Sequence, residues 1–276
     1  MSDILILGYH GISERWTSSL AVRPDCFERQ LQLLCDRGYQ GVTFERAMTA
    51  PPPGRSVAIT FDDGCRSVIE LALPMMARYG MVGTAYVPTD HVGSPRPMSW
   101  PGIEQWTGSP HEDDLMAMSW DDLGELADAG WEIGSHTCSH SHLTRLDEDR
   151  LAAELEQSRT CCEERLGRPC RTIAYPYGDI DHRVIAATER AGYRAGASIV
   201  PVPVRPFSVF NWPRTGIYLD DDERRFKFKI TPHGRKLHAS HAWRGISHAR
   251  AALRRRAPTA VASMEVFERA FGMGLA

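Results

Sequence analysis

Two adjacent acids follow a short apolar run. The run SVAITF (residues 56–61) is rich in β-branched and aromatic residues and predicts a buried strand that ends at Asp62 and Asp63. On a continuing strand, successive side chains point to opposite faces, so these acids could not share one site there. Gly64 lets the chain turn, which allows both carboxylates to lie at the C-terminal end of the strand. A metal cation commonly holds two close carboxylates, whereas a plain surface turn is the alternative, since Asp-Gly pairs are frequent in turns.

Two histidines, four positions apart, follow another predicted strand. Residues 131–133 form the strand, and His136 and His140 come shortly after it. On a helical turn, side chains at this spacing lie on one face, with Cβ atoms roughly 5–6 Å apart. Together with Asp63 they form a two-histidine, one-carboxylate set that leaves a position open for water, the layout of a catalytic zinc site. His142, two positions further along, would point elsewhere on such a helix and is interpreted as a bystander.

These segments resemble the motifs of the polysaccharide deacetylase family, also called the NodB-homology or carbohydrate esterase 4 family. The acid motif is TFDDG (residues 60–64) and the histidine motif is SHTCSH (residues 135–140). The segment YPYG (residues 175–178) is similar to the third motif of the family. The segment LILGYH (residues 5–10) resembles the opening strand of a permuted subgroup that includes the poly-N-acetylglucosamine deacetylases, in which a histidine motif lies at the N-terminus. The resemblance covers roughly residues 4–218.

The resemblance implies an α/β fold, a distorted (β/α) barrel with its site at the C-terminal ends of the strands. It implies that Asp63, His136 and His140 bind one divalent metal ion, with zinc (Zn2+) as the expected ion. A bound divalent ion can lower the pKa of water to about 7 and polarise a carbonyl. The implied activity is a metal-dependent hydrolysis that removes an N-acetyl group from an amino sugar, within a glycan, on a carrier or in a small-molecule glycoside.

The resemblance also implies three catalytic roles. Asp62 would act as the general base, and His10 would protonate the leaving amine. The backbone N–H of Tyr177 would contribute to the oxyanion hole. A histidine that merely has its hydrogen bonds satisfied at a strand end is the alternative interpretation of His10.

One position departs from the pattern of the family. Most relatives carry an arginine that steadies the general base where this chain has Ala174. We expect Arg214 to take that role from a neighbouring strand, with Arg66 as the second candidate. The acidic segment that orients the catalytic histidine in relatives is not recognisable, and Asp179 is the candidate for its function.

Strand and helix patterns alternate along the chain and predict parallel βαβ units. Asp25 is the expected N-cap of the first helix, and Pro74 is expected to kink or break the second. The expected strands are 4–7, 42–44, 56–61, 83–87, 131–133, 172–174, 196–199 and 209–212, and the expected helices are 25–36, 66–79, 119–129, 149–166 and 183–191.

A long Pro- and Gly-rich stretch, residues 88–117, interrupts this alternation. Loops of this length in a compact domain are usually functional or disordered. We interpret the stretch as a lid loop that offers Trp100 or Trp106 to a sugar ring, with a simple surface insertion as the alternative.

Composition indicates a soluble globular protein. The chain has 276 residues, of which 42% are hydrophobic and 24% charged, so its core is ample for one large domain or two. Seven cysteines without zinc-ribbon spacing suggest reduced thiols. The first residues carry no basic and apolar signal pattern, which favours a cytoplasmic protein, either free or peripheral at the membrane.

The charge distribution divides the chain into a catalytic domain, residues 1–223, and a basic C-terminal appendage, residues 224–276. Residues 224–264 hold 11 Lys and Arg and neither Asp nor Glu. Such a segment suits a membrane surface or an acidic partner, or it folds back on the acidic domain. No nucleic acid is expected, because no reader motif is present. Alternating apolar and charged positions between residues 226 and 230 predict an edge strand.

Two other functions fit the same motifs. A metal-dependent amidase would act on a non-sugar N-acyl compound, and a degenerate relative would bind carbohydrate without catalysis. The joint presence of Asp62, Asp63, His136, His140 and His10 argues against the second, because binding alone does not need all five. The expected partner is therefore an N-acetylated sugar substrate, and the missing signal pattern favours a nucleotide-, lipid- or metabolite-linked one.

Overall fold

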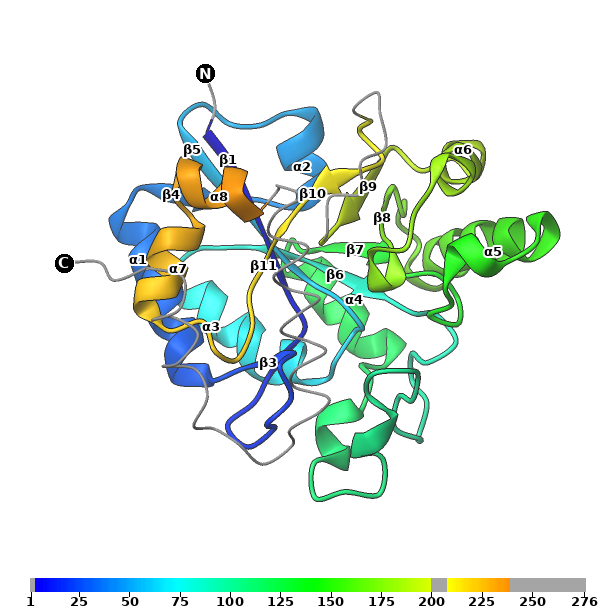
Figure 1. Cartoon of the computed structure of the whole chain (residues 1–276), viewed down its shortest axis with the longest axis horizontal. Helices are drawn as coiled ribbons and strands as arrows, with labels where there is room; N and C mark the ends of the chain where they lie inside the picture. The colour runs from blue at the N-terminus through cyan, green and yellow to red at the C-terminus, as the bar shows by residue number, and fades with distance from the viewer. Residues whose placement is uncertain (1–2, 200–207, 239–276) are drawn as a thin grey trace, which may run out of the picture.

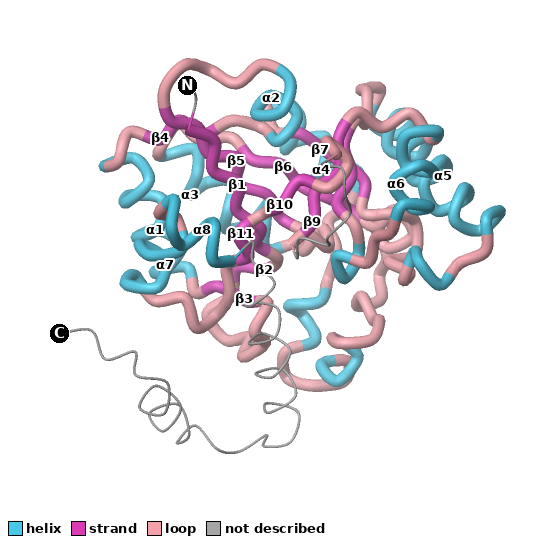
Figure 2. Tube along the Cα trace, turned by 45° about the horizontal axis from the view of Figure 1, so that its top comes forward, coloured by secondary structure: helices cyan, strands magenta, loops and turns pink. Residues whose placement is uncertain are grey.

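Parallel strands curl into a nearly closed barrel, and helices cover its outside (Figure 1, Figure 2). The computed structural model describes residues 3–199 and 208–238. The predicted fold class, an α/β barrel, is confirmed. The strands are β1 (Asp3–Tyr9), β2 (Gly11–Ile12), β3 (Ala21–Val22), β4 (Tyr39–Gly41), β5 (Arg55–Phe61), β6 (Gly83–Val87), β7 (Glu132–Ser135), β8 (Thr172–Ala174), β9 (Ala195–Ser198), β10 (Trp212–Pro213) and β11 (Thr215–Gly216). The helices are α1 (Pro24–Asp36), α2 (Phe44–Thr49), α3 (Leu73–Arg78), α4 (Trp120–Asp128), α5 (Glu148–Leu166), α6 (His182–Arg190), α7 (Glu223–Lys229) and α8 (Pro232–His238).

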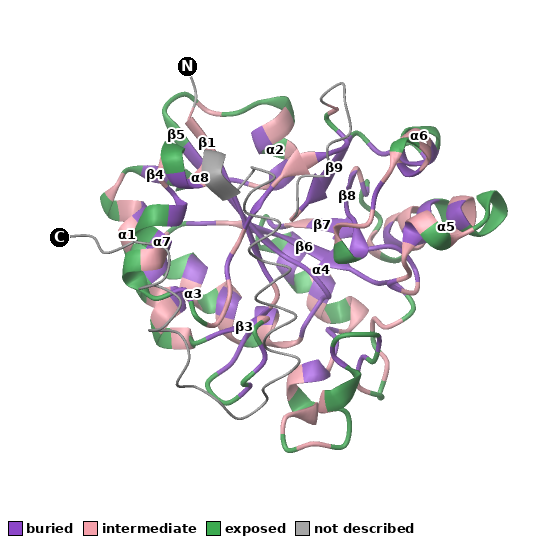
Figure 3. Ribbon diagram, in the orientation of Figure 1, coloured by how far each residue is buried: buried purple, intermediate pink, exposed green. Residues whose placement is uncertain are grey.

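The main sheet has the strand order β10-β9-β8-β7-β6-β5-β1-β11, and β4 adds to β5. Its central strands are apolar and buried (Figure 3), as expected for parallel strands whose two faces are both covered. β1 and β5 pair in register from Asp3 with Arg55 to Tyr9 with Phe61. The residues that directly follow these two strands therefore emerge side by side at the C-terminal end of the barrel.

One extended segment joins the two edges of the sheet. β10 pairs with β9, and β11 pairs with β1, so the chain crosses the seam at the single residue between them, Arg214. The Arg214 N–H donates to the Ser198 carbonyl (2.8 Å), and the Ile217 N–H donates to the Gly8 carbonyl (2.8 Å). The segment thus closes the barrel and places Arg214 at the seam.

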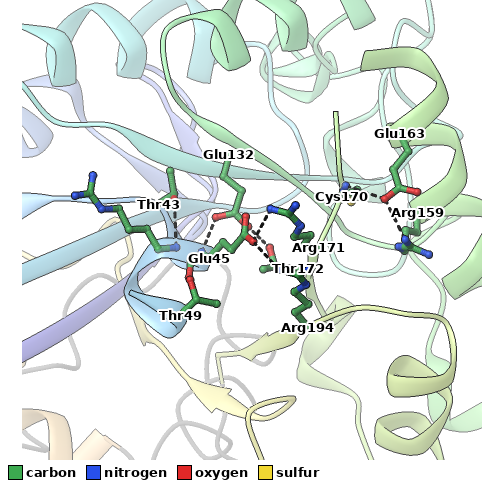
Figure 4. A network of polar contacts seen from close by, with 11 residues as sticks. Thr43, Glu45, Thr49, Glu132, Arg159, Glu163, Cys170, Arg171, Thr172 and Arg194 are labelled. Carbon is green, nitrogen blue, oxygen red and sulfur yellow. Dashed lines mark hydrogen bonds and ion pairs between the residues drawn. The ribbon is translucent and has the colours of Figure 1, made fainter. Parts of the chain in front are cut away.

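A partly buried carboxylate organises the N-terminal end of the barrel (Figure 4). Glu132, the first residue of β7, accepts hydrogen bonds from the Glu45 N–H (2.8 Å) and from the hydroxyls of Thr84 (3.0 Å) and Thr172. The Glu45 carboxylate in turn forms an ion pair with Arg171 (3.0 Å). Burial raises the pKa of Glu132. This network ties α2 to β6, β7 and β8 at the end opposite the acid and histidine motifs.

Three predicted strands are wrong or misplaced. The expected strand at residues 42–44 is replaced by the start of α2, because the Thr43 hydroxyl caps the helix by accepting from the Arg46 N–H (3.2 Å). Of residues 209–212, only Trp212 lies in a strand. The expected edge strand near residue 226 is the helix α7, which buries Phe226 on its inner face while Phe228 is exposed.

α1 and α3 each have a proline in their first turn. α1 begins at Pro24 with Arg23 as its N-cap; the predicted cap, Asp25, lies instead in the first turn, where it pairs with Arg29 (2.9 Å). The predicted break at Pro74 is confirmed. A π-helical turn, Val68–Ala72, precedes α3, and Pro74 lies in the first turn of that helix, where its missing N–H is tolerated.

The beginning of the basic segment packs on the barrel. Phe226 and Ile230 are buried in the main hydrophobic core, and Arg235 forms an ion pair with Asp3 (2.8 Å). The described residues therefore show no break in the core at residue 223, and the rest of the appendage, residues 239–276, lies outside them. None of the described helices has both the length and the apolar character needed to cross a bilayer.

Candidate active site

The structure brings the predicted metal ligands together at the C-terminal end of the barrel. Asp63 Oδ1 lies 3.4 Å from His136 Nε2 and 3.3 Å from His140 Nε2, and all three residues are buried. Within the described chain, Asp63 Oδ1 is buried without a well-aligned hydrogen-bond donor. A cation would satisfy this oxygen and both nitrogens at once.

A loop, and not the predicted helical turn, brings the two histidines together. It leaves β7 and adopts left-handed backbone at Thr137 (φ 66°) and His140 (φ 60°). The Thr137 N–H donates to the Ser135 hydroxyl (3.0 Å), and the His140 N–H donates to Thr137 Oγ1 (3.2 Å). Two reversals of the chain, and not helical periodicity, therefore direct both imidazoles to Asp63.

The pKa shifts of the three donors differ. The pKa values of Asp63 and His140 are shifted toward the forms that bind a cation. Burial would lower the pKa of His136, but the carboxylates of Asp63 and Asp62 outweigh burial and raise it. His136 Nδ1–H donates to the Ala174 carbonyl (2.7 Å), which leaves the Nε2 lone pair facing Asp63. Burial alone would raise the pKa of Asp63, but the adjacent imidazoles hold it well below its ordinary value, so the carboxylate is ionised. Burial also lowers the pKa of His140, which favours the neutral ligand form. One carboxylate oxygen and two imidazole nitrogens suit zinc and similar transition ions.

Arg214 forms a bidentate pair with Asp62. Its two terminal nitrogens donate to Asp62 Oδ1 (2.6 Å) and Oδ2 (2.7 Å), and Nη1 also donates to the Thr60 hydroxyl (2.8 Å). Burial would raise the pKa of Asp62, but the Arg214 charge holds it below its ordinary value. Arg66, the second candidate, forms an ion pair with Glu70 instead (3.1 Å). The arginine partner of Asp62 that Ala174 cannot supply is thus present in the segment 212–216, which closes the barrel.

His10 lies beside the two acids. The Asp62 N–H donates to the Tyr9 carbonyl (2.9 Å), which sets His10 level with Asp62 across the β1–β5 pair. The His10 charge also acts to lower the pKa values of Asp62 and Asp63, although burial and the nearer partners of each acid have larger effects on these pKa values. His10 Nδ1 is buried and has no hydrogen-bond partner among the described residues.

The predicted role of Asp179 in orienting His10 is wrong. The Asp179 carboxylate accepts hydrogen bonds from the backbone N–H (3.1 Å) and hydroxyl (2.8 Å) of Thr144, and it lies 3.6 Å from His142 Nδ1. Both oxygens of Asp179 therefore bind the short 3-10 turn Leu143–Arg145, which follows the histidine loop. This acid holds the C-terminal side of that loop.

Tyr177 joins the histidine loop to the third motif. Its backbone is left-handed (φ 59°), and its half-exposed ring stacks on His142, with centroids 3.9 Å apart and planes at 13°. The same ring meets His140 edge-on at 4.7 Å. His142 is therefore not the predicted bystander, because its ring supports Tyr177, which contacts the predicted ligand His140.

The long loop after β6 supports the site from within. Trp100 is only 7% exposed and stacks on His140, with ring centroids 4.0 Å apart and planes at 17°. His91 meets Trp100 edge-on (5.1 Å), while Trp106 packs edge-on against Trp16 (6.3 Å). The prediction that Trp100 presents its ring to a sugar is therefore wrong, because the face of the indole covers the His140 imidazole.

Backbone strain gathers at this site. Among the described residues, the non-glycine residues with positive φ are Asp63, Thr137, His140 and Tyr177. Such conformations cost free energy and persist only where the surroundings enforce them. The strain therefore marks the same place as the motifs, by an independent observation.

Sequence reasoning missed two supports of the histidine loop. No sequence signal marks Trp100 as a partner of His140, because their contact depends on how the long loop folds. Glu154 carries a signal in the sequence: it precedes Leu155 near the buried side of α5, where an acid needs a hydrogen-bond partner.

Comparison with known proteins agrees with the motifs. The sequence model of the polysaccharide deacetylase family, described as "Polysaccharide deacetylase", matches residues 49–196, which is more than half of the chain. The chain therefore belongs to the polysaccharide deacetylase family.

Individual relatives share the same stretch. YxkH of Bacillus subtilis, named after this family, is 28% identical over 201 residues, which cover 71% of this chain and 64% of that protein. The poly-beta-1,6-N-acetyl-D-glucosamine N-deacetylase of Staphylococcus aureus is 25% identical over 213 residues, covering 72% of this chain and 68% of that one. The structure of the Streptococcus pyogenes deacetylase PplD in complex with acetate matches with a TM-score of 0.69 at 23% identity, over 83% of this chain and 98% of that chain. The chain thus spans less than two thirds of the Bacillus protein, and the structural likeness shows the shared fold.

Proposed function

We propose that the protein is a metal-dependent N-deacetylase that removes acetyl groups from N-acetylated amino sugars. The observation that carries this proposal is the arrangement of Asp63, His136 and His140 around one point, beside an Asp62 that Arg214 holds ionised. Membership of a deacetylase family supports the reaction type.

Asp63, His136 and His140 would hold the ion, with zinc as the proposed metal. When bound, the ion supplies a Lewis acid that polarises the acyl oxygen and acidifies water. The donor set has three protein ligands, the number found in catalytic zinc sites in which water or substrate takes the fourth position.

Asp62 is proposed as the general base that takes a proton from the attacking water. Its pairing with Arg214 keeps it ionised and fixes its orientation, although the same charge lowers its basicity. His10, on the neighbouring strand, would give a proton to the leaving amine. The Tyr177 backbone N–H would donate to the oxygen on which negative charge develops.

The substrate class is an N-acetylated amino sugar in a glycan, on a carrier or in a small glycoside. The name of the Staphylococcus aureus relative, a poly-beta-1,6-N-acetyl-D-glucosamine N-deacetylase, supports a glucosamine-type substrate. A cytoplasmic location, and attachment of the basic segment 224–276 to a membrane surface or an acidic partner, stay predictions. A non-sugar N-acyl compound would use the same catalytic residues, so the substrate screen has to include such amides.

Acetate release from a panel of N-acetylated sugars and simple N-acetyl amides tests the function. We expect release from a sugar substrate, and we expect Asp62→Asn to lower its rate by about 10²–10⁴-fold while metal content is unchanged. Glu70→Gln, on an exposed ion pair, is the matched control and should keep full activity. Undiminished turnover of Asp62→Asn would assign the base to another residue.

A further inference from the structure

The loop that carries both histidines is attached to one turn of helix α5. The carboxylate of Glu154 accepts hydrogen bonds from the backbone N–H groups of Cys138 (2.8 Å) and Ser139 (3.0 Å), and from the Ser139 hydroxyl. These two residues lie between His136 and His140. The carboxylate therefore holds the stretch of chain that sets the separation of the two imidazoles.

A second attachment lies one helical turn further along α5. The hydroxyls of Ser158 and Ser135 are hydrogen-bonded to each other (2.8 Å), and the Ser135 oxygen accepts the Thr137 N–H (3.0 Å). Positions 154 and 158 lie on the same face of the helix because they are four residues apart. Both ends of the reversal at Thr137 are thus tied to a single rigid element.

The loop needs such ties because its own backbone opposes the geometry. Thr137 and His140 are non-glycine residues in the left-handed region, and Thr137 is also β-branched, which makes the conformation unfavourable. A Ser139 or Cys138 N–H left without its acceptor in this half-buried position would favour a different loop conformation. Such a conformation would separate the imidazoles.

We propose that Glu154 is a positioning residue of the metal site, which acts by fixing the loop between the two histidine ligands. This inference rests on the proposed function only in so far as the site binds a metal. Within the described chain, the hydrogen bonds of the Glu154 carboxylate go to Cys138 and Ser139, both in this loop. α5 does not depend on them, since Asp147 caps it and Leu151, Leu155 and Cys162 anchor it.

The test compares Glu154→Ala, Glu154→Gln and the control Glu156→Ala in the full chain. Glu156 lies on the exposed face of the same helix. Zn2+ affinity is measured by competition with a chromophoric chelator, the melting temperature of the metal-free protein by circular dichroism, and ligand geometry by the absorption spectrum of the Co2+ form. Mutation of a residue that holds metal ligands in place typically changes the metal affinity by about 10–100-fold.

We expect Glu154→Ala to bind Zn2+ about 10–100-fold more weakly and to alter the Co2+ spectrum, while its metal-free melting temperature matches that of the control. Glu154→Gln should fall between wild type and Glu154→Ala, because its amide oxygen can still accept both backbone N–H groups, which share Oε2 in the wild type, but without the charge that strengthens these hydrogen bonds. Wild-type Zn2+ affinity in both Glu154 variants would overturn the inference, and so would a lowered melting temperature with unchanged affinity. If wild type binds Zn2+ but releases no acetate, the proposed function fails while the affinity comparison still decides the role of Glu154.

Discussion

Replacing Arg214 by methionine tests how the closing segment serves the site. Methionine has a similar length and is apolar, so it fills the space while it removes the charge and all three hydrogen bonds to Asp62 and Thr60. The Arg214 side chain is 0% exposed and that of Asp62 is 3% exposed. The variant therefore leaves a buried carboxylate without its partner.

The expected loss is large for a single substitution. Breaking a buried ion pair by removing one partner typically costs about 3–5 kcal/mol of unfolding free energy, because the remaining charge is uncompensated. Arg66→Met is the matched control. Its ion pair with Glu70 is 41% and 55% exposed, and such surface pairs contribute about 0–1 kcal/mol.

The pH dependence gives the sign of the effect. Burial acts to raise the pKa of Asp62, but Arg214 brings it below its ordinary value. The pair therefore stabilises the wild type fully above the ordinary carboxyl pKa of about 3.9, and this contribution is lost as the pH falls through the lower folded value. In Arg214→Met the lowering effect of the guanidinium is gone, while burial still raises the Asp62 pKa and the charges of His136 and His10 still lower it. The Asp62 pKa is therefore higher than in the wild type, the carboxyl is protonated more readily, and the deficit should be smaller at pH 5 than at pH 8.

Urea denaturation of wild type, Arg214→Met, Asp62→Asn and the double variant measures these free energies. The double variant should lose clearly less than the sum of the single losses, since it contains no unpaired charge. Strictly additive losses, or a deficit for Arg214→Met no larger than that of Arg66→Met, would refute the argument that Arg214 is the electrostatic partner of the base.

Three further predictions concern single residues. His136→Ala should reduce bound metal from stoichiometric to trace amounts in elemental analysis, whereas His182→Ala, outside the site, should retain it; full metal content in the His136 variant would contradict the ligand assignment. His10→Ala should bind metal normally but lose more turnover on amides than on matched esters, because an alkoxide leaves more readily than an unprotonated amine, and equal losses would remove its role as general acid. Glu132→Gln addresses a partly buried acid whose pKa is raised by removal from solvent. The stability that its proton contributes is therefore full below about pH 4.5 and declines as the pH rises through the raised value. The Gln variant lacks this titration, so its unfolding free energy relative to wild type should increase from pH 4.5 to pH 8. An equal change of unfolding free energy with pH in both proteins would contradict a raised pKa of Glu132.

Much of the barrel is predictable from local pattern. The strands at residues 83–87 and 172–174 are found because buried parallel strands are apolar or β-branched on both faces. The capping box of α4 is equally local, since the Ser119 side chain and Asp122 bond to each other's backbone. Prediction fails for short segments whose apolar positions fit both the period of a strand and that of a helix. The apolar residues 226, 228 and 230 suit a strand, but the i, i+4 pair Phe226 and Ile230 faces the core of the folded protein.

The site is less predictable than the barrel. The residue types of Asp63, His136 and His140 predict their convergence, but four-residue spacing gives the wrong local structure. The left-handed backbone at Thr137 is imposed by tertiary hydrogen bonds, which local propensity does not contain. The sequence predicts Arg214 only as a substitute for the arginine missing at Ala174, because its distance to Asp62 depends on how the sheet closes.

The seam of the barrel has a consequence for the order of folding. β10 pairs with β9, which is near it in sequence, whereas β11 pairs with β1, which is far from it in sequence. The contact between β11 and β1 therefore closes the longest loop in the sheet. Arg214 reaches Asp62 only when both contacts exist. A chain with its first strands assembled but its seam open would therefore hold Asp62 without its guanidinium partner. Completion of the sheet and formation of the Asp62–Arg214 pair are therefore coupled.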